Sequence, residues 1–372
     1  MFHTFPAEHI ENFTNRLFTW FKASMRPLPW RSCYDPYEIW ISEVMLQQTQ
    51  MERGVSFFLR WIERFPSVES VASAAEEEIL RVWEGLGYYR RARLLHAAAK
   101  CMVSKHGGRI PDTQAELLAL PGLGEYTANA ILSIAYGHDI AVVDANVERV
   151  FSRLLDIDAP VKNAPVKSFI RKEAQRLLPC GNARTYNQAL MELGALLCKK
   201  HALCRQCPMT EWCMAYRKNT VMSRPVQNPR AATERLVSAH ALLIHGDRIL
   251  MRKRDDAGLW GGMWEFPGII CSGPDIMEQL HAFLGHLGLP MKTLQQAGKI
   301  THNYTNHRLT AHFFRCDTDL SDLTHMDEQN SGRLRLVPCE KIVSLAMPAH
   351  HRKIAERLFD QPAAQCRLKK EG

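Results

Sequence analysis

Apolar residues recur every three or four positions through the first part of the chain, which predicts amphipathic helices. The spacing is regular over 13–21 and again over 71–83. Short turns rich in glycine or proline divide this pattern, as at 85–87. Residues 7 to about 215 are therefore expected to form an all-α domain.

The pattern changes after Cys213. A polar stretch with two prolines and no periodicity, 216–233, predicts a linker. Short runs of β-type residues follow it, with one helical stretch among them. The predicted strands are 236–244, 248–251 and 311–316, and the predicted helix is 274–288. This alternation predicts a smaller α+β domain.

A chain of 372 residues has room for two domains. We expect a helical domain over 1–215, the linker 216–233, an α+β domain over 234–360 and a polar tail over 361–372. No apolar run is long enough to span a membrane, and the first twenty residues form an amphipathic pattern without a signal peptide. A cytoplasmic protein is expected, and its net charge of +8 suits a polyanionic partner.

Cysteine spacing predicts a metal centre at the end of the helical domain. Four of the eleven cysteines fall in the pattern C-x5-C-x2-C-x5-C, namely Cys198, Cys204, Cys207 and Cys213. In a reducing compartment such a group binds Zn²⁺ or a [4Fe–4S] cluster more often than it forms disulfides. Zinc sites usually contain two CxxC pairs, and only one is present here, which favours the cluster. The intervening residues are too polar for an ordinary core.

A glycine-rich turn precedes a helix at Leu120-Pro121-Gly122-Leu123-Gly124. Gly122 and Gly124 allow a tight turn with positive φ, and the next helix opens with free N–H groups. Such a helix-hairpin-helix element can hold a DNA phosphate through backbone donors without reading the base sequence. An ordinary turn between two helices is the alternative interpretation.

Two carboxylates stand out near this hairpin. Asp144 follows an apolar run and precedes a helical pattern, so it is expected to cap a helix. Glu43 lies on an apolar helical face, where burial should raise its pKa. A glutamate that stays protonated near neutral pH is suited to general-acid catalysis. A surface glutamate would be the ordinary interpretation of Glu43, but the run 40–50 (WISEVMLQQTQ) is unusually apolar around it.

Together these features resemble MutY-type adenine DNA glycosylases of the endonuclease III superfamily, over essentially the whole chain. The most specific matching segments are 27–31, 40–50, 85–93, 120–128, 142–150 and 187–194. The resemblance implies removal of adenine opposite 8-oxoguanine, and of adenine opposite guanine, from double-stranded DNA during base excision repair. It also implies a [4Fe–4S] cofactor and a monomeric protein, which in a bacterium would be associated with the nucleoid.

The resemblance also implies roles for individual residues. Glu43 matches the acid that protonates the departing adenine, and Asp144 matches the carboxylate that stabilises an oxocarbenium-like sugar. Tyr126 and Asn146 match residues that support these two. Residues matching the adenine pocket and the base stack near the lesion are Arg31, Trp30, Leu46, Gln48, Tyr88 and Glu192. Relatives that cleave the strand carry lysine at position 126, so Tyr126 predicts a monofunctional glycosylase.

The second domain resembles the Nudix-like domain of the same family, through 255–268. A working Nudix hydrolase needs a glutamate-rich helix for Mg²⁺, and the segment 276–283 lacks that set. The domain is therefore expected to recognise the lesion, through a loop at Tyr304, Thr305 and Asn306 where relatives carry Phe-Ser-His. A plain β-turn is the alternative for this loop.

Three other functions are considered. A bifunctional endonuclease acting on oxidised pyrimidines is disfavoured by Tyr126 and by the second domain. A non-catalytic DNA-binding module is disfavoured by the presence of both Glu43 and Asp144. A nucleotide pyrophosphatase is disfavoured by the missing glutamates.

Overall fold

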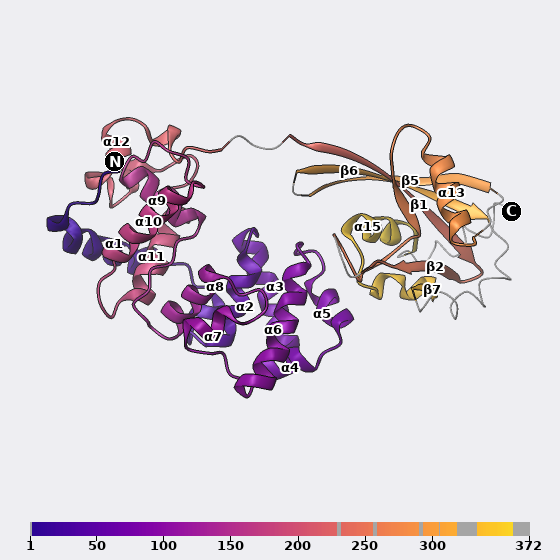
Figure 1. Cartoon of the computed structure of the whole chain (residues 1–372), viewed down its shortest axis with the longest axis horizontal. Helices are drawn as coiled ribbons and strands as arrows, with labels where there is room; N and C mark the ends of the chain where they lie inside the picture. Colours follow the sequence, from indigo (N-terminus) through magenta and orange to yellow (C-terminus); the bar gives the residue numbers. More distant parts are fainter. Residues whose placement is uncertain are drawn as a thin grey trace. The chain divides into compact units, whose positions relative to one another are not determined.

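The computed structural model describes residues 2–228, 232–255, 259–289, 293–304, 306–317 and 333–359. The chain divides into two compact units. The first comprises Met1–Ser73 with Leu94–Pro229, and the second comprises Ala74–Arg93 with Arg230–Gly372. Figure 1 shows helices in the first unit, and strands together with helices in the C-terminal segment. The sequence thus predicts the two classes of structure, an all-α part followed by a part with a sheet.

Helices form the first unit. Their bounds are α1 (Ile10–Ser24), α2 (Pro36–Leu46), α3 (Met51–Arg64), α4 (Val68–Ser73), α6 (Arg90–His106), α7 (Gln114–Leu118), α8 (Glu125–Ala130), α9 (Ala145–Leu154), α10 (Ala164–Arg176), α11 (Ala183–Leu196) and α12 (Met214–Arg217). The helix α5 (Glu76–Trp83) and the first turn of α6 belong to the second unit. A π-helical turn (Ile131–Ala135) continues α8.

Local sequence signals explain where the functional helices begin. Asp35 caps α2 by accepting hydrogen bonds from the backbone N–H groups of Tyr37 and Glu38, with Pro36 at the first helical position. Asp144 caps α9 and accepts from the N–H of Val147, as the sequence predicts. These caps fix the ends of α2 and α9, the helices that carry Glu43 and Asp144.

A continuous apolar core joins the helices around Asp144. It includes Phe13 and Leu17 of α1, Phe151 of α9 and Leu190 of α11, all fully buried. Burying side chains of this size contributes about 1.5–3 kcal/mol each. The N-terminus of α9 is therefore held on a rigid base of three helices.

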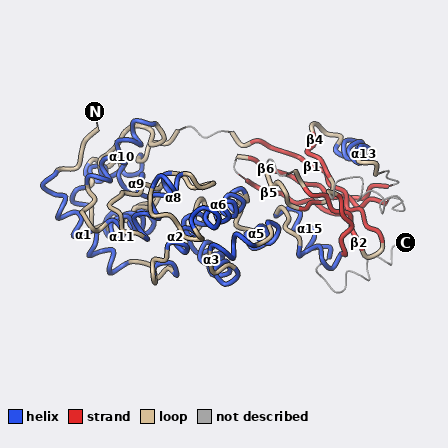
Figure 2. The backbone as a smooth tube through the Cα atoms, turned by 60° about the horizontal axis from the view of Figure 1, so that its bottom comes forward, coloured by secondary structure: helices blue, strands red, loops and turns tan. Residues whose placement is uncertain are grey.

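A sheet organises the second unit, and Figure 2 shows it in red. Its described strands are β1 (Glu234–His245), β2 (Arg248–Lys253), β3 (Trp264–Glu265), β4 (Gly268–Cys271), β5 (Thr293–Tyr304), β6 (His307–Asp317) and β7 (Leu334–Pro338), in the order β3-β2-β1-β6-β5 with β4 beside β1 and β7 beside β2. β1 pairs parallel with β6, and β5 pairs antiparallel with β6. The helices α13 (Ile276–His286) and α15 (Ala349–Phe359) complete the unit.

The sequence predicts β1, β2, β6 and α13 but not β5. β5 reads TLQQAGKITHNY, which lacks the apolar alternation of a half-buried strand. Of its residues only Ile300 is buried, so pairing with β6 determines this strand more than burial does.

The segment 216–233, predicted as a linker, is attached to the first unit near its start. Arg224 forms an ion pair with Asp156, 2.9 Å apart, which fixes this part of the chain to the first unit.

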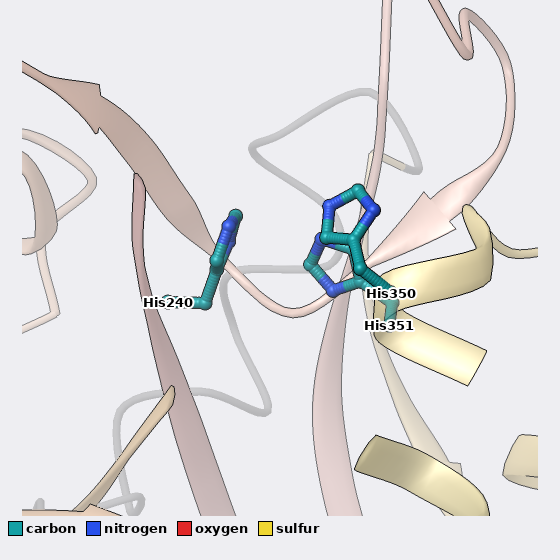
Figure 3. Close-up of side chains that lie close together, drawn as sticks. All are labelled: His240, His350 and His351. Carbon is teal, nitrogen blue, oxygen red and sulfur yellow. The ribbon is translucent and has the colours of Figure 1, made fainter. Parts of the chain in front are cut away.

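Three buried histidines meet in the core of the second unit: His240 of β1, with His350 and His351 of α15 (Figure 3). Hydrogen bonds with the backbone of Phe266 indicate the tautomers of His351 and His240. His351 Nδ1 accepts from the Phe266 N–H at 3.2 Å, so its proton lies on Nε2. His240 Nδ1 lies 3.3 Å from the Phe266 carbonyl and donates to it, while its Nε2 accepts from Ser238 at 2.9 Å. Because these bonds occupy the lone pairs of His240 and His351, we interpret the two histidines as groups that hold the backbone of Phe266, and not as metal ligands. We call this arrangement the histidine clamp.

The clamp predicts loss of stability in acid. Burial lowers the pKa of His240 from 6.5 to about 4. Between these values the unfolded chain binds a proton on His240 that the folded chain does not, so His240 alone should lower the free energy of unfolding by about 3 kcal/mol as the pH decreases from 6.5 to 4. Thermal unfolding across this range tests it. His240→Gln should flatten the dependence and the exposed-site control His245→Gln should not; equal slopes in all three proteins would contradict it.

Candidate active site

One cavity of about 720 Å³ in the first unit brings most of the predicted site residues together. Its lining includes Trp30, Arg31, Glu43, Leu46, Gln48, Gly124, Tyr126, Asp144, Asn146 and Glu192. These residues come from α2, α8, α9, α11 and the turns before them. The helix-hairpin-helix element therefore forms one wall of the same cavity as the two carboxylates.

Glu43 lies near the end of α2 with 9% of its surface exposed. Its Oε2 accepts a hydrogen bond of 2.8 Å from the Tyr126 hydroxyl. The pKa of Glu43 is raised to about 7, because burial and, to a smaller extent, the negative charge of Asp144 outweigh the lowering by the Tyr126 hydrogen bond and by Arg31. Glu43 is thus a carboxyl group that holds a proton near neutral pH and faces a cavity.

Asp144 is held from two sides by its own helix. Its Oδ1 accepts from the Val147 N–H at 2.7 Å, and its Oδ2 accepts from Asn146 Nδ2 at 2.8 Å. Burial raises the pKa of Asp144, whereas these hydrogen bonds and Arg149 lower it. The bonds leave the carboxylate oriented and partly desolvated at the cavity wall.

A charged network closes the opposite wall. Glu192, 1% exposed, lies 2.8 Å from Arg31 Nη1 and 2.9 Å from Arg26 Nε. Arg31 Nε donates to Gln188 Oε1 at 2.8 Å. Two cations around one carboxylate, with an amide beside them, form a fixed polar surface that can hydrogen-bond a planar base.

The hairpin glycines differ in what they do. Gly122 has φ of +76°, and an added Cβ would lie 2.6 Å from Leu94 Cβ, so this position requires glycine. Gly124 has an extended conformation with φ of −91° and free space around it. The prediction of a positive φ is therefore confirmed for Gly122 and wrong for Gly124, which instead caps α8.

Gly194 of α11 supports Asn146. A Cβ at position 194 would lie 2.5 Å from Asn146 Cβ and 3.0 Å from its carbonyl oxygen. We expect Gly194→Ala to displace Asn146 from Asp144 and to lower the single-turnover rate of the base removal that the sequence predicts by about a hundredfold. Gly285→Ala, at a helical glycine of α13 with nothing within 4 Å, is the control that should leave the rate unchanged. An unchanged rate in Gly194→Ala would show that this contact does not position Asn146.

Gln48 lies at the cavity edge, exposed and with a positive φ of 58°. Such a conformation is costly for a residue other than glycine and concentrates at functional sites. Tyr88 has the same property, with φ of 51°, but belongs to the second compact unit. Tyr304 and Asn306 also belong to that unit, at the turn between β5 and β6, and Thr305 lies outside the described residues.

The four cysteines gather around a small cavity of about 30 Å³. Burial raises the pKa of Cys207 to about 12 and that of Cys213 to about 11. Four thiols that converge in a desolvated place, with Arg153 Nη1 3.4 Å from Cys198 Sγ, fit a bound metal centre whose charge would keep them deprotonated. Cys198 and Cys204 are separated by five residues, and both reach this cavity.

The cysteine loop is linked to the cavity. Arg149 of α9 donates to the carbonyl of Cys198 at 2.6 Å and to Asn146 Oδ1 at 2.7 Å. The same guanidinium donates to the carbonyl of Gly194 at 2.8 Å. The cysteines are far from Asp144 in sequence. Arg149 nevertheless connects their loop to Asn146, the residue that orients Asp144.

Sequence reasoning missed Gln188, Arg26 and Arg149. Gln188 lies one helical turn before Glu192, and Arg149 lies one turn after Asn146, so helical spacing could have indicated both. Arg26 contacts Glu192 across 166 residues of sequence, a separation at which no local pattern exists.

Comparisons with known proteins identify the families and the fold to which the two parts of the chain are similar. Residues 41–179 match the HhH-GPD superfamily of base excision DNA repair proteins, and residues 239–357 match the NUDIX domain. A thermostable thymine-DNA glycosylase of known structure, 28% identical, covers 57% of this chain and 98% of its own, with a TM-score of 0.52. An endonuclease III–DNA complex, 23% identical with a TM-score of 0.50, has the same fold over 57% of this chain and 97% of that one.

The fold and the site thus define a helix-hairpin-helix DNA glycosylase. Mouse adenine DNA glycosylase is 33% identical over 368 residues, covering 83% of this chain and 71% of the relative. Adenine DNA glycosylase of Buchnera aphidicola subsp. Baizongia pistaciae is 33% identical over 247 residues, covering 66% of this chain and 70% of the relative. The chain belongs to the adenine DNA glycosylase family, enzymes of base excision repair. No described helix is long and apolar enough to cross a membrane.

Proposed function

We propose that the chain removes adenine mispaired with 8-oxoguanine, or with guanine, from duplex DNA and leaves the strand uncut. The observation that carries this proposal is Glu43: a buried carboxyl with a pKa of about 7, bonded to Tyr126 and facing a cavity that also holds Asp144. One neutral acid and one oriented carboxylate are the pair that glycosidic bond cleavage requires.

In the proposed reaction an adenine extruded from the duplex occupies the cavity against Trp30, Arg31, Gln188 and Glu192. Glu43 gives its proton to the base, and the glycosidic bond breaks with its electron pair leaving on adenine. The oxocarbenium-like sugar that results is stabilised by Asp144, whose two oxygens are oriented by Val147 and Asn146. Water then adds to the sugar and its proton returns to Glu43.

A monofunctional reaction is supported by the chemistry of the cavity lining. Strand cleavage of the relatives' kind needs an amine that attacks the sugar to form a Schiff base. Tyr126 offers a hydroxyl, and no lysine occurs among the described residues that line the cavity. We propose a [4Fe–4S] cluster at Cys198, Cys204, Cys207 and Cys213, which would hold the loop 199–206 with its basic side chains toward DNA phosphates.

The second domain is proposed to recognise 8-oxoguanine. Tyr304 is partly exposed at its hairpin, with its ring centroid 5.1 Å from His307 and 4.9 Å from Trp260. Aromatic rings of this kind can stack against a base. The helix α13 contains a single carboxylate, Glu278, and so lacks the acidic set of a nucleotide hydrolase.

The deciding experiment is release of adenine from a duplex containing A:8-oxoguanine, followed by gel analysis with and without alkali. We expect free adenine and strand breakage only after alkali. Release of pyrimidines, or borohydride trapping of a covalent complex, would overturn the proposal. A deletion of 226–372 should erode the preference for A:8-oxoguanine over A:G, and an unchanged preference would remove the recognition role.

The pKa of Glu43 predicts a pH profile. The acid acts only when protonated, so kcat/KM should fall about tenfold per unit above pH 7. A second limb at lower pH should appear where Asp144 takes up a proton and loses its charge, since burial raises its pKa as well. Because the Tyr126 hydroxyl lowers the pKa of Glu43, Tyr126→Phe should move this limb to higher pH. A limb that stays in place in Tyr126→Phe would indicate that another group controls the profile.

A further inference from the structure

Tyr88 lies in a strained loop, 84–89, between α5 and α6. Its φ of 51° is unfavourable for a residue with a side chain, and 45% of the residue's surface is exposed. Gly85 and Gly87, which precede it in the loop, also have positive φ, 94° and 81°. An exposed aromatic residue keeps such a conformation only where neighbouring groups hold it.

Two donors hold the loop at the carbonyl of Gly87. Trp83 Nε1 donates to it at 3.0 Å, and Arg91 Nη2 donates to it at 3.0 Å. The Arg91 backbone N–H donates to the carbonyl of Tyr88 at 2.8 Å, and the Tyr89 hydroxyl accepts from the Gly85 N–H. Arg91 thus donates to the peptide before Tyr88 Cα through its side chain and to the peptide after it through its backbone.

The Arg91 guanidinium also lies between two aromatic rings. It is 5.3 Å from the centroid of the buried Trp83 ring and 5.5 Å from that of Tyr88. Burial lowers the pKa of Arg91 to about 10, so the group remains cationic at neutral pH. A partly desolvated cation within 6 Å of a ring face is attracted to it.

We propose that Arg91 is the positioning residue of Tyr88. Its planar fork bonds the Gly87 carbonyl while its face supports the Tyr88 ring, and this holds the ring ready to insert into the base stack. The inference rests on the proposed function and on the family resemblance, which implies that Tyr88 enters the base stack near the lesion. Lysine cannot replace it, since one ammonium cannot both bond the carbonyl and present a flat face to the ring.

The test is a double-mutant cycle on the full-length protein with a 2-aminopurine base beside the mispair. Arg91→Met and Tyr88→Ala should each reduce the rate of the fluorescence change on binding by about tenfold. In the Tyr88→Ala background, Arg91→Met should add nothing, because both remove the same contact. Arg91→Lys should resemble Arg91→Met, and the exposed neighbour variant Arg90→Met should resemble the wild type.

Additive effects of Arg91→Met and Tyr88→Ala would overturn the proposal, since Arg91 would then act elsewhere. A rate of fluorescence change in Arg91→Lys equal to that of the wild type would also overturn the proposal. Unfolding measured for each variant separates a folding defect from loss of positioning, because a general defect would lower the rate in the Tyr88→Ala background as well. Insertion is followed without excision, so failure of the proposed adenine chemistry is seen separately in the release assay.

Discussion

Glu43→Gln is expected to lower adenine excision by about 10²–10⁴-fold, the usual contribution of a positioned general acid. Glutamine keeps the size of the side chain and its carbonyl oxygen still accepts from the Tyr126 hydroxyl. It has no proton of suitable acidity to give to the base. Binding of the mispaired duplex should remain, because Glu43 lies inside a cavity and carries no charge when protonated.

Single-turnover excision and filter binding measure the two effects separately. Glu52→Gln, at an exposed glutamate of α3 in the same unit, is the matched control and should retain both. Excision by Glu43→Gln within about threefold of the wild-type rate would remove Glu43 as the acid. Loss of binding together with excision would indicate a damaged fold.

Asp144→Asn is expected to lower the single-turnover rate by about 10²–10³-fold through a different step. Asparagine still caps α9, because its oxygen can accept from the Val147 N–H. The negative charge that would stabilise the sugar cation is lost. Arg149 fixes the Asn146 oxygen on its far side, so the Asn146 amide group would then face the new amide of residue 144.

The pH profile distinguishes this variant from a general loss of structure. The charge of Asp144 raises the pKa of Glu43, so its removal should move the limb near pH 7 to lower pH in the residual activity. A limb at the wild-type pH would show that the two carboxylates are not coupled. A rate equal to that of the wild type would remove Asp144 from the reaction.

The sequence predicts those parts of the site that depend on local pattern. The apolar face around Glu43 predicts its burial and raised pKa, and the residue types before α9 predict the cap at Asp144. The sequence pattern cannot predict contacts between side chains on helices that are far apart in the chain. The pairing of Arg26 with Glu192 and the tight contact of Gly194 with Asn146 arise only when helices far apart in the chain come together.

The same distinction applies to the fold. β1 and β2 have apolar runs and are predicted, whereas β5 is polar and exists through its pairing with β6. Pairing between strands is not encoded in the pattern of one strand. Nor could the sequence show that residues 74–93 are grouped with the C-terminal segment.

The cavity lining has a consequence for what the proposed reaction leaves behind. With a tyrosine hydroxyl at position 126 and no lysine among the described lining residues, the proposed reaction would release the base and leave the sugar as a hemiacetal in an unbroken backbone. That product is an abasic site, a reactive aldehyde in equilibrium with its ring form. The proposed reaction therefore requires a separate endonuclease to cut the strand in the next step.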